Sequence, residues 1–218
     1  MQNVVCVLSV RPSVETYQFY RKLKLKTNYD VYIVIDDDSF DTSAFDNVVT
    51  MLKVNRIECE THGFKSSVLW LSGRACSRDK ALYYFSNVKI DYKFIWLIED
   101  DVFVPNARTL VNMDKQYREG DLLSASHEIL HTIPDDWHWK HVLSQTQLKP
   151  PFGRSMICAI RCSTRMLRAI RAYATRFKDL FLDESLFNTL AIKNNLQVKV
   201  IPELDSILYP SRLETFRR

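Results

Sequence analysis

Glycine is scarce in this sequence, which has only four in 218 residues. An average chain of this length carries about four times as many. The four lie far apart, at Gly63, Gly73, Gly120 and Gly153. Phosphate-binding loops of the GxGxxG and GxxxxGK[ST] types need glycines close together, so both types are excluded. If the chain binds a nucleotide, another device must hold it.

Paired cysteines and long apolar runs are also missing. The five cysteines are an odd number, with no CxxC pair and no His partner at zinc-finger spacing. This pattern argues against a disulfide framework and favours a reducing, cytoplasmic compartment. No segment approaches 18 consecutive apolar residues, so we expect no membrane span. The short apolar run near the start lacks the basic leader and cleavage site of a signal peptide.

Charge of one sign does not dominate. Thirty Lys and Arg stand against 26 Asp and Glu, which gives a formal net charge of +4. That balance allows an anionic small ligand but lacks the basic stripe of a nucleic-acid binder, so no nucleic-acid partner is expected. With 46% hydrophobic residues, including 12 Phe, 10 Tyr and 4 Trp, the chain can bury a large core and is not disordered.

Short apolar runs alternate with helical stripes along the chain. Residues 4–10 and 31–35 form β-branched runs on either side of a helical stripe that ends near Lys26, which predicts a β-α-β unit. Further strands are predicted at 55–58, 93–98, 122–126, 155–160 and 197–201, further helices at 74–85, 105–116, 163–177 and 183–194, and a loop at 127–153. The sequence therefore predicts an α/β fold: a single domain over residues 1–218, with a central, mostly parallel sheet flanked by helices.

Acidic clusters follow two of the predicted strands. Asp36-Asp37-Asp38 ends the second strand, and Glu99-Asp100-Asp101 ends the strand at 93–98. Ligands of open α/β sheets bind at the carboxyl ends of strands, and crowded carboxylates are relieved by Mg²⁺ or Mn²⁺. The alternative is that these acids only cap a helix or turn the chain. A third pair, Asp183-Glu184, begins a predicted helix, either as a cap or as a general base.

The strand followed by Glu99-Asp100-Asp101 resembles the DXD motif of glycosyltransferases with the GT-A fold. Other segments follow in the order of that family: the strand and turn at 4–12, the strand and acids at 31–38, a small-residue and arginine segment at 72–79, and an acid-bearing helix start at 182–190. The resemblance covers about residues 3–203. Three features depart from the family: Glu99 replaces the first Asp, the Gly-rich acceptor-side segment is reduced to 152–154, and no His follows His141 as a third metal ligand.

The resemblance implies transfer of a sugar from a UDP-sugar to an acceptor hydroxyl on a glycan or glycoprotein. It implies a nucleotide-binding half at about 1–103, an acceptor-side half at about 104–218, and Mn²⁺ or Mg²⁺ held by Asp101. Glu184 would be the general base of an inverting reaction, with Asp183 as the second candidate. The nucleotide sugar would be bound by Val10, Arg11, Asp36, Asp38, Arg74, Arg78, Glu99 and Asp100. The acceptor side would include Trp137, His138 and Trp139.

Two other functions fit the same residues. A metal-dependent nucleotidyltransferase or phosphohydrolase would also place carboxylates at strand ends. In a non-catalytic carbohydrate- or protein-binding module, the acids would be structural. Without a membrane anchor, the chain resembles the soluble glycosyltransferase domains of bacteria or of large DNA viruses such as algal viruses, which implies the cytoplasm, and the host cytoplasm if the protein is viral.

Overall fold

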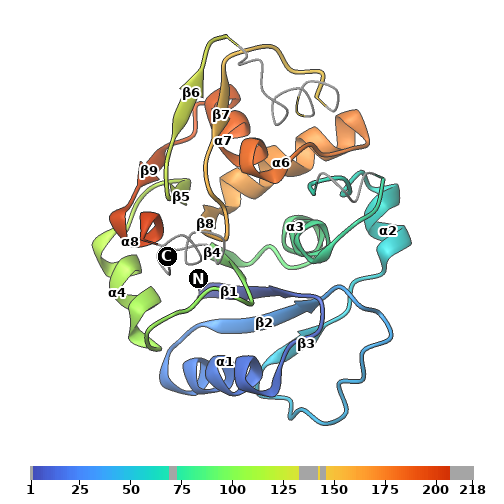
Figure 1. Ribbon diagram of the computed structural model, residues 1–218, viewed down its shortest axis with the longest axis vertical. Coiled ribbons are helices and arrows are strands. Elements are labelled where there is room, and N and C mark those ends of the chain that lie inside the picture. Colours follow the sequence, from blue (N-terminus) through green and yellow to red (C-terminus); the bar gives the residue numbers. More distant parts are fainter. Residues whose placement is uncertain (1, 69–72, 133–141, 143–145, 207–218) are drawn as a thin grey trace, which may run out of the picture.

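A seven-stranded sheet forms the centre of the protein (Figure 1). The computed structural model describes residues 2–68, 73–132, 142 and 146–206. The strand order is β3-β2-β1-β4-β8-β5-β9, and β8 alone runs antiparallel to its neighbours. The strands are β1 (Gln2–Ser9), β2 (Asp30–Ile35), β3 (Thr50–Leu52), β4 (Tyr92–Glu99), β5 (Leu122–Ser124), β8 (Ala159–Ser163) and β9 (Val198–Val200). This confirms the α/β fold with a mostly parallel sheet.

Helices cover both faces of the sheet, which gives three layers (Figure 1). One face packs against α2 (Arg56–Thr61), α3 (Ser77–Asn87), α6 (Thr164–Phe177) and α7 (Asp183–Lys193). The other packs against α1 (Val14–Lys26), α4 (Arg108–Gln116) and the short α8 (Pro202–Asp205). Successive side chains of a strand point to opposite faces. Accordingly, Val4 and Cys6 join the core under α3 and α6, and Val5 and Val7 join the core under α1.

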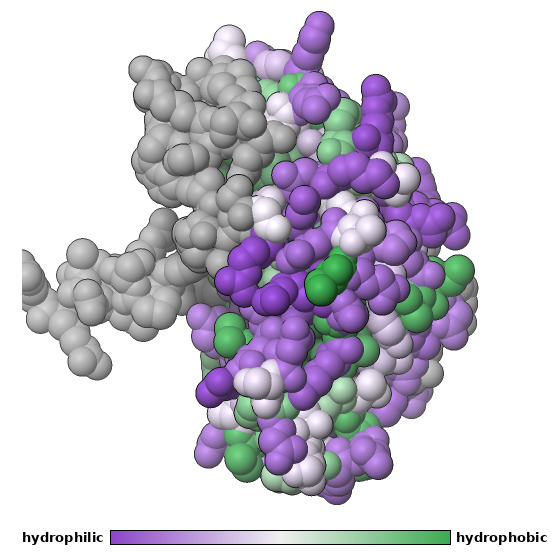
Figure 2. Space-filling model, turned by 90° about the vertical axis from the view of Figure 1, so that its right-hand side faces the viewer, coloured by the Kyte–Doolittle hydropathy of each residue, from purple (hydrophilic) through white to green (hydrophobic). Residues whose placement is uncertain are grey.

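The surface on the side of α2 is mostly hydrophilic. Figure 2 shows that side, with single hydrophobic residues scattered among polar ones. Exposed apolar residues that stand singly are normal for a folded domain. This view therefore shows no broad apolar surface of the kind that docks a partner in the part of the chain that is described.

Three predicted elements differ most from the structure. Residues 55–58, predicted as a strand, lie at the start of α2, because the Asn55 side chain caps the helix by accepting from the Glu58 amide at 3.0 Å. The loop predicted at 127–153 contains β6 (Glu128–Leu130) and the start of β7 (Phe152–Arg154), which form a separate antiparallel pair. The strand predicted at 155–160 instead spans Ala159–Ser163.

Gly153 lets β7 approach α7 closely. A Cβ atom added there would lie 2.7 Å from Cβ of Asn188 and 2.8 Å from its carbonyl carbon, and the Gly153 amide donates to Thr189 Oγ1 at 2.9 Å. Because backbone cannot move aside cheaply, we expect Gly153→Ala to lower the free energy of unfolding by roughly 1–3 kcal/mol. Urea unfolding measures this. Arg154→Ala, which removes only a half-exposed ion pair with Glu128, should cost less than about 1 kcal/mol. Equal effects of the two substitutions would contradict the steric argument.

Candidate active site

The two acidic clusters lie on either side of the end of β1. The Asp36 amide donates to the Ser9 carbonyl at 2.9 Å, and the Asp100 amide donates to the Leu8 carbonyl at 3.1 Å. The Ser9 hydroxyl also donates to the Asp100 carboxylate. Since β2 and β4 both run parallel to β1, their carboxyl ends meet at one edge of the sheet. The acids that the sequence places far apart therefore share this acidic edge.

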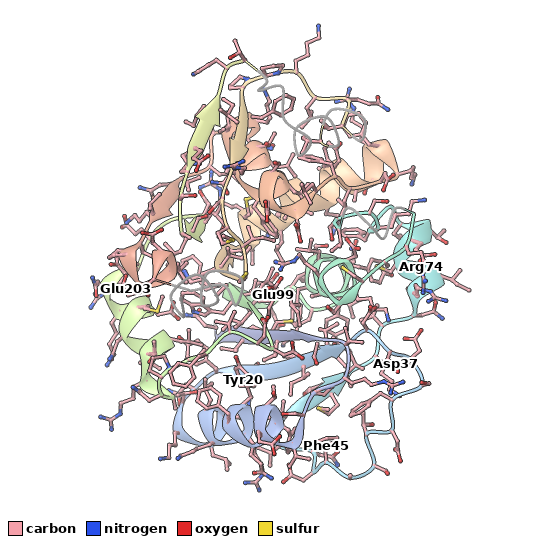
Figure 3. All side chains as sticks on the ribbon, in the orientation of Figure 1. Tyr20, Asp37, Phe45, Arg74, Glu99 and Glu203 are labelled. Atoms are coloured by element: carbon pink, nitrogen blue, oxygen red, sulfur yellow. The ribbon has the colours of Figure 1, made fainter. Side chains whose placement is uncertain are left out.

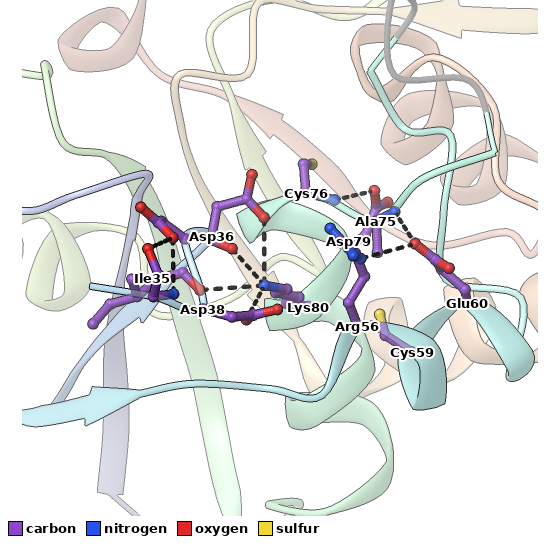
Figure 4. A network of polar contacts seen from close by, with 12 residues as sticks. Ile35, Asp36, Asp38, Arg56, Cys59, Glu60, Ala75, Cys76, Asp79 and Lys80 are labelled. Carbon is purple, nitrogen blue, oxygen red and sulfur yellow. Dashed lines mark hydrogen bonds and ion pairs between the residues drawn. The ribbon is translucent and has the colours of Figure 1, made fainter. Parts of the chain in front are cut away.

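A buried lysine holds the first cluster. Lys80 on α3 has no exposed side-chain surface, and its Nζ donates to the Asp36 carbonyl at 2.7 Å and to Asp38 Oδ1 at 2.9 Å (Figure 4). Asp36 Oδ1 lies 3.5 Å from the same nitrogen. The repulsion within this cluster is thus relieved by a protein cation. Sequence reasoning missed Lys80. The available signal was the run of three charged residues Arg78-Asp79-Lys80. These residues span about 200° of a helix that packs against the sheet, so they cannot all face the solvent.

A buried arginine joins the second cluster to α7. Arg78 donates from Nη2 to Glu99 Oε1 at 2.5 Å, and its Nε lies 2.9 Å from Asp183 Oδ2. Its Nη1 donates to the Ile157 carbonyl at 3.2 Å, and only 3% of the side chain is exposed. All three contacts are with protein, which suits Arg78 to positioning Glu99 and Asp183.

The neighbouring acids Asp183 and Glu184 have different surroundings. Asp183 is buried, and burial raises its pKa above the ordinary range, against the opposing effect of Arg78. Its Oδ1 accepts the Glu184 amide at 2.9 Å, so both of its oxygens have partners. Glu184 is half-buried, and its carbonyl accepts the Ser155 amide at 2.9 Å. Adjacent helical side chains point about 100° apart, so Glu184 points in a different direction from Asp183.

Asp101 is exposed beside two other carboxylates. Its pKa is raised by partial burial and then by the charges of Glu99 and Asp100. Among the described residues, no group of three or more His, Cys, Asp or Glu is arranged to hold a metal ion. Mg²⁺ is nevertheless often bound by one or two carboxylates together with substrate phosphates. The hard oxygen donors of Asp100 and Asp101 fit that kind of site, and a cation there would relieve the repulsion that raises the Asp101 pKa.

The remaining predicted residues are dispersed. Val10 and Arg11 are exposed near the acidic edge, and Arg11 forms an ion pair with Asp37 at 2.5 Å. The pKa of Asp37 is lowered to about 2, mainly by two hydrogen bonds from Ser39 and further by Arg11. Arg74 lies beside α2, well apart from Glu99 (Figure 3). The structure thus separates Arg74 from Glu99. The acceptor-side residues Trp137, His138 and Trp139 lie outside the described residues.

A polar group lies beyond the end of β5, on the side of α7. Asn188 donates from Nδ2 to the Ser126 carbonyl at 3.1 Å and contacts His127 Nδ1 at 2.8 Å. This contact places the His127 proton on Nε2, because Nδ1 must accept, and burial lowers the pKa of His127. Asn188 is one helical turn after Glu184, so both lie on one side of α7. Sequence reasoning assigned His127 only to a loop and missed Asn188, for which the available signal was its place one helical turn after Glu184.

Asp79 provides a test by pH. It is fully buried, its Oδ2 accepts the Cys76 amide at 3.0 Å, and burial raises its pKa to about 6 from 3.8. Because the folded chain holds this proton more tightly, the associated stability is complete below about pH 4 and is lost as the pH rises through 6. Asp79→Asn keeps an acceptor and removes the titration. We expect the stability of the wild-type protein relative to Asp79→Asn to fall between pH 4 and 7, by on the order of 2 kcal/mol. Urea unfolding at pH 4, 5, 6 and 7 measures it, and parallel pH curves would refute the assignment.

Comparison with known proteins gives a fold but no family. No family model matches the sequence, and no curated protein matches it. Among solved structures, the chain is similar to the 4-diphosphocytidyl-2C-methyl-D-erythritol synthase of Anaerococcus prevotii, with a TM-score of 0.53 and 9% identity over 92% of this chain and 88% of that one. The galactosyltransferase LgtC, crystallised with donor and acceptor sugar analogs, gives 0.44 at 9% identity over 87% and 69%. Mouse xyloside xylosyltransferase 1 gives 0.46 at 10% identity over 92% and 84%.

These likenesses are to proteins of the GT-A-like class, the nucleotidyl-diphospho-sugar transferases. At such low identity they show the fold alone, and only the first has a score above 0.5. The chain therefore has a GT-A-like α/β fold, with its acidic clusters at the carboxyl edge of the sheet. Among the helices that the structure describes, none combines the length with the apolar composition that a membrane span requires.

Proposed function

We propose that this protein is a glycosyltransferase that moves a sugar from a UDP-sugar to an acceptor hydroxyl on a glycan or glycoprotein. The observation that carries the proposal is the chain of contacts from Glu99 through Arg78 to Asp183. These contacts hold the acid cluster at the end of β4 next to the start of α7. In the proposed reaction the acid cluster would bind the donor, and the start of α7 would activate the acceptor. A structural role alone would not require carboxylates from β4 and α7 to meet at the ligand-binding edge of the sheet.

On the donor side, the carboxylates would bind the nucleotide sugar. Asp36 and Asp38, held by Lys80, would accept hydrogen bonds from the nucleoside, and Glu99 or Asp100 would accept them from ribose hydroxyls. Mn²⁺ or Mg²⁺, bound by Asp101, would supply the positive charge that the leaving diphosphate needs. A glycine-rich loop would not be required.

On the acceptor side, Glu184 would act as the general base. Its carboxylate would take the proton of the acceptor hydroxyl while that oxygen bonds to the anomeric carbon. As this bond forms, the bond from that carbon to the diphosphate oxygen breaks, and its electron pair leaves with UDP. Asp183 would position the helix start, because both of its oxygens are already occupied by Arg78 and the Glu184 amide. Attack opposite to the leaving group would invert the anomeric centre.

A nucleotidyltransferase is the second candidate. The solved structure with the score of 0.53 is by its name a synthase of a diphosphocytidyl compound, and the same acids would suit phosphate transfer. The two candidates differ in the nucleotide that binds: UDP for the glycosyltransferase and a nucleoside triphosphate for the nucleotidyltransferase.

Calorimetric titration with UDP, UDP-sugars and CTP, each with and without Mn²⁺, tests the proposal. We expect UDP to bind only with Mn²⁺, and Asp101→Asn to weaken it at least tenfold, since the metal would lose its carboxylate. Asp91→Asn, at an exposed carboxylate of which 76% is accessible, is the matched control and should bind like the wild type. Binding of CTP without UDP would replace the proposal with the second candidate, and no nucleotide binding would refute both.

A further inference from the structure

A cavity opens at the edge of the sheet opposite to the acidic edge. It has a volume of about 810 Å³ and lies between the end of α1 and one side of α4. The turn at 26–29 forms one wall, α4 and the turn after it form the other, and Asn3 of β1 contributes to the lining. Figure 1 shows α1 and α4 on the same side of the sheet. Asn3 is six positions before Ser9, so the cavity is about 20 Å from the acidic edge.

The cavity gathers positive charge. Its lining contains four cationic side chains, Lys26, Arg108, Lys115 and Arg118. The formal net charge of the whole chain is +4, so the number of cations in this cavity equals the excess of positive charge in the chain. Among the residues that the structure describes, none of the four forms an ion pair with a carboxylate.

The one carboxylate in the lining is already neutralised. Asp114 accepts from the buried Arg161 at 2.7 Å, from Asn3 Nδ2 at 2.7 Å and from the Trp96 indole at 3.2 Å. The Tyr29 hydroxyl donates to it as well, at 2.5 Å. Asp114 therefore belongs to a buried network beneath the cavity, and it does not offset the four cations around it.

The neutral part of the lining narrows the ligand class. The lining also contains the amides of Asn3, Asn28 and Asn112 and the hydroxyl of Thr27, which are groups that bind sugar hydroxyls. Asn3 Nδ2 and the Thr27 hydroxyl already donate to Asp114 and to the Leu23 carbonyl, so these two residues would contribute their oxygens as acceptors. Tyr29 is buried, and its hydroxyl is bonded to Asp114, so it offers no face for stacking a nucleic-acid base. Residues 207–218 carry three Arg and one Glu, so that segment has the same charge as the cavity and is not its complement.

We infer that this cavity binds a carbohydrate that carries two or more phosphate or sulfate groups. Its volume is within the range of small-ligand sites, the cations match the anionic groups, and the amides match the hydroxyls. A smaller cavity of about 530 Å³, on α6, has three Arg but is lined by that helix alone and lacks amides. The inference is independent of the reaction proposed for the acidic edge, because the two sites share no residue.

Calorimetry with glucose 1,6-bisphosphate tests the inference. We expect binding to the wild type and equally to Asp101→Asn, which places the probe away from the acidic edge. The double substitution Arg108→Glu/Lys115→Glu should weaken binding at least tenfold. Lys22→Glu/Lys149→Glu makes the same change in charge at exposed residues outside the cavity and should stay within twofold of the wild type. If the first double variant does not fold, Arg108→Gln/Lys115→Gln replaces it, with at least a fivefold loss expected.

Five results would overturn the inference. Binding of glucose as tight as that of glucose 1,6-bisphosphate would remove the anionic requirement. Binding of inorganic phosphate as tight as that of the bisphosphate would show that the carbohydrate part of the ligand is not recognised. Equal losses in both double variants would show a general charge effect, and no binding to the wild type at millimolar probe would leave no site. Vesicles containing phosphatidylinositol phosphate that bind where glucose 1,6-bisphosphate does not would identify a membrane surface instead.

Discussion

Glu184→Gln should abolish most sugar transfer while donor binding survives. Glutamine keeps the size and the hydrogen-bonding shape of the side chain but cannot accept a proton from the acceptor hydroxyl. General-base assistance contributes roughly 10²–10⁴-fold to a rate, so the turnover of this variant should fall by that factor. The affinity for UDP with Mn²⁺ should change less than about twofold, because Glu184 would lie on the acceptor side. Initial rates of UDP release and calorimetric titration give the two quantities.

The matched control is Glu119→Gln. Glu119 is exposed and lies before β5, so it is at the opposite edge of the sheet from Glu184. Both substitutions remove one negative charge, and only Glu184→Gln should slow transfer. Asp183→Asn separates the neighbouring acids: it should weaken the positioning of α7 but retain a base. Near-normal turnover in Glu184→Gln, together with a complete loss in Asp183→Asn, would reverse the two assignments.

Arg78→Met should be the most destabilising substitution among those proposed. It removes the cation between Glu99 and Asp183 and leaves the buried Asp183 carboxylate without its ion pair. Removing one partner of a buried pair costs roughly 3–5 kcal/mol, because the remaining carboxyl must either stay charged without a partner or take up a proton. Chemical denaturation at pH 7 measures the loss in the free energy of unfolding.

Two further variants show whether the cost comes from the buried charge. Arg78→Met/Asp183→Asn removes the stranded carboxylate as well and should recover about half of the loss or more. Arg11→Met breaks an ion pair with Asp37 in which the arginine side chain is 65% exposed, so it should cost less than about 1 kcal/mol. If Arg11→Met costs as much as Arg78→Met, burial is not the cause.

The sheet was predictable where its strands are apolar throughout. β1, β2 and β4 each contain a nearly continuous run of apolar or aromatic residues, and the sequence predicts them within two residues. β8 was displaced because Arg161 interrupts its apolar pattern. In the structure that arginine is buried, pairs with Asp114 at 2.7 Å and lies over the Phe94 ring at 4.0 Å. A buried, paired cation looks like a surface residue in a sequence, since its partner is distant along the chain.

The same reason limits prediction of the candidate site. The acids at the ends of β2 and β4 could be placed at one edge, because parallel strands end together. The contacts of Arg78 and Lys80 could not, since they depend on α3 entering the core between segments that are far apart in sequence. Arg78 lies 21 positions from Glu99 but 105 from Asp183, and no local pattern links residues so far apart.

Because β8 runs antiparallel to β4, the segment that precedes β8 in the chain lies beside the carboxyl end of β4. β8 pairs with β4 on one side and β5 on the other, so the segment leading into it reaches the acidic edge, where the Ile157 carbonyl meets Arg78. A fragment ending near residue 103 would expose a full strand edge on β4 and leave Arg78 without Asp183 and Ile157. Such a fragment should aggregate when expressed alone. Splitting this protein for complementation or domain exchange therefore requires a cut that keeps α3, β4 and β8 on the same piece.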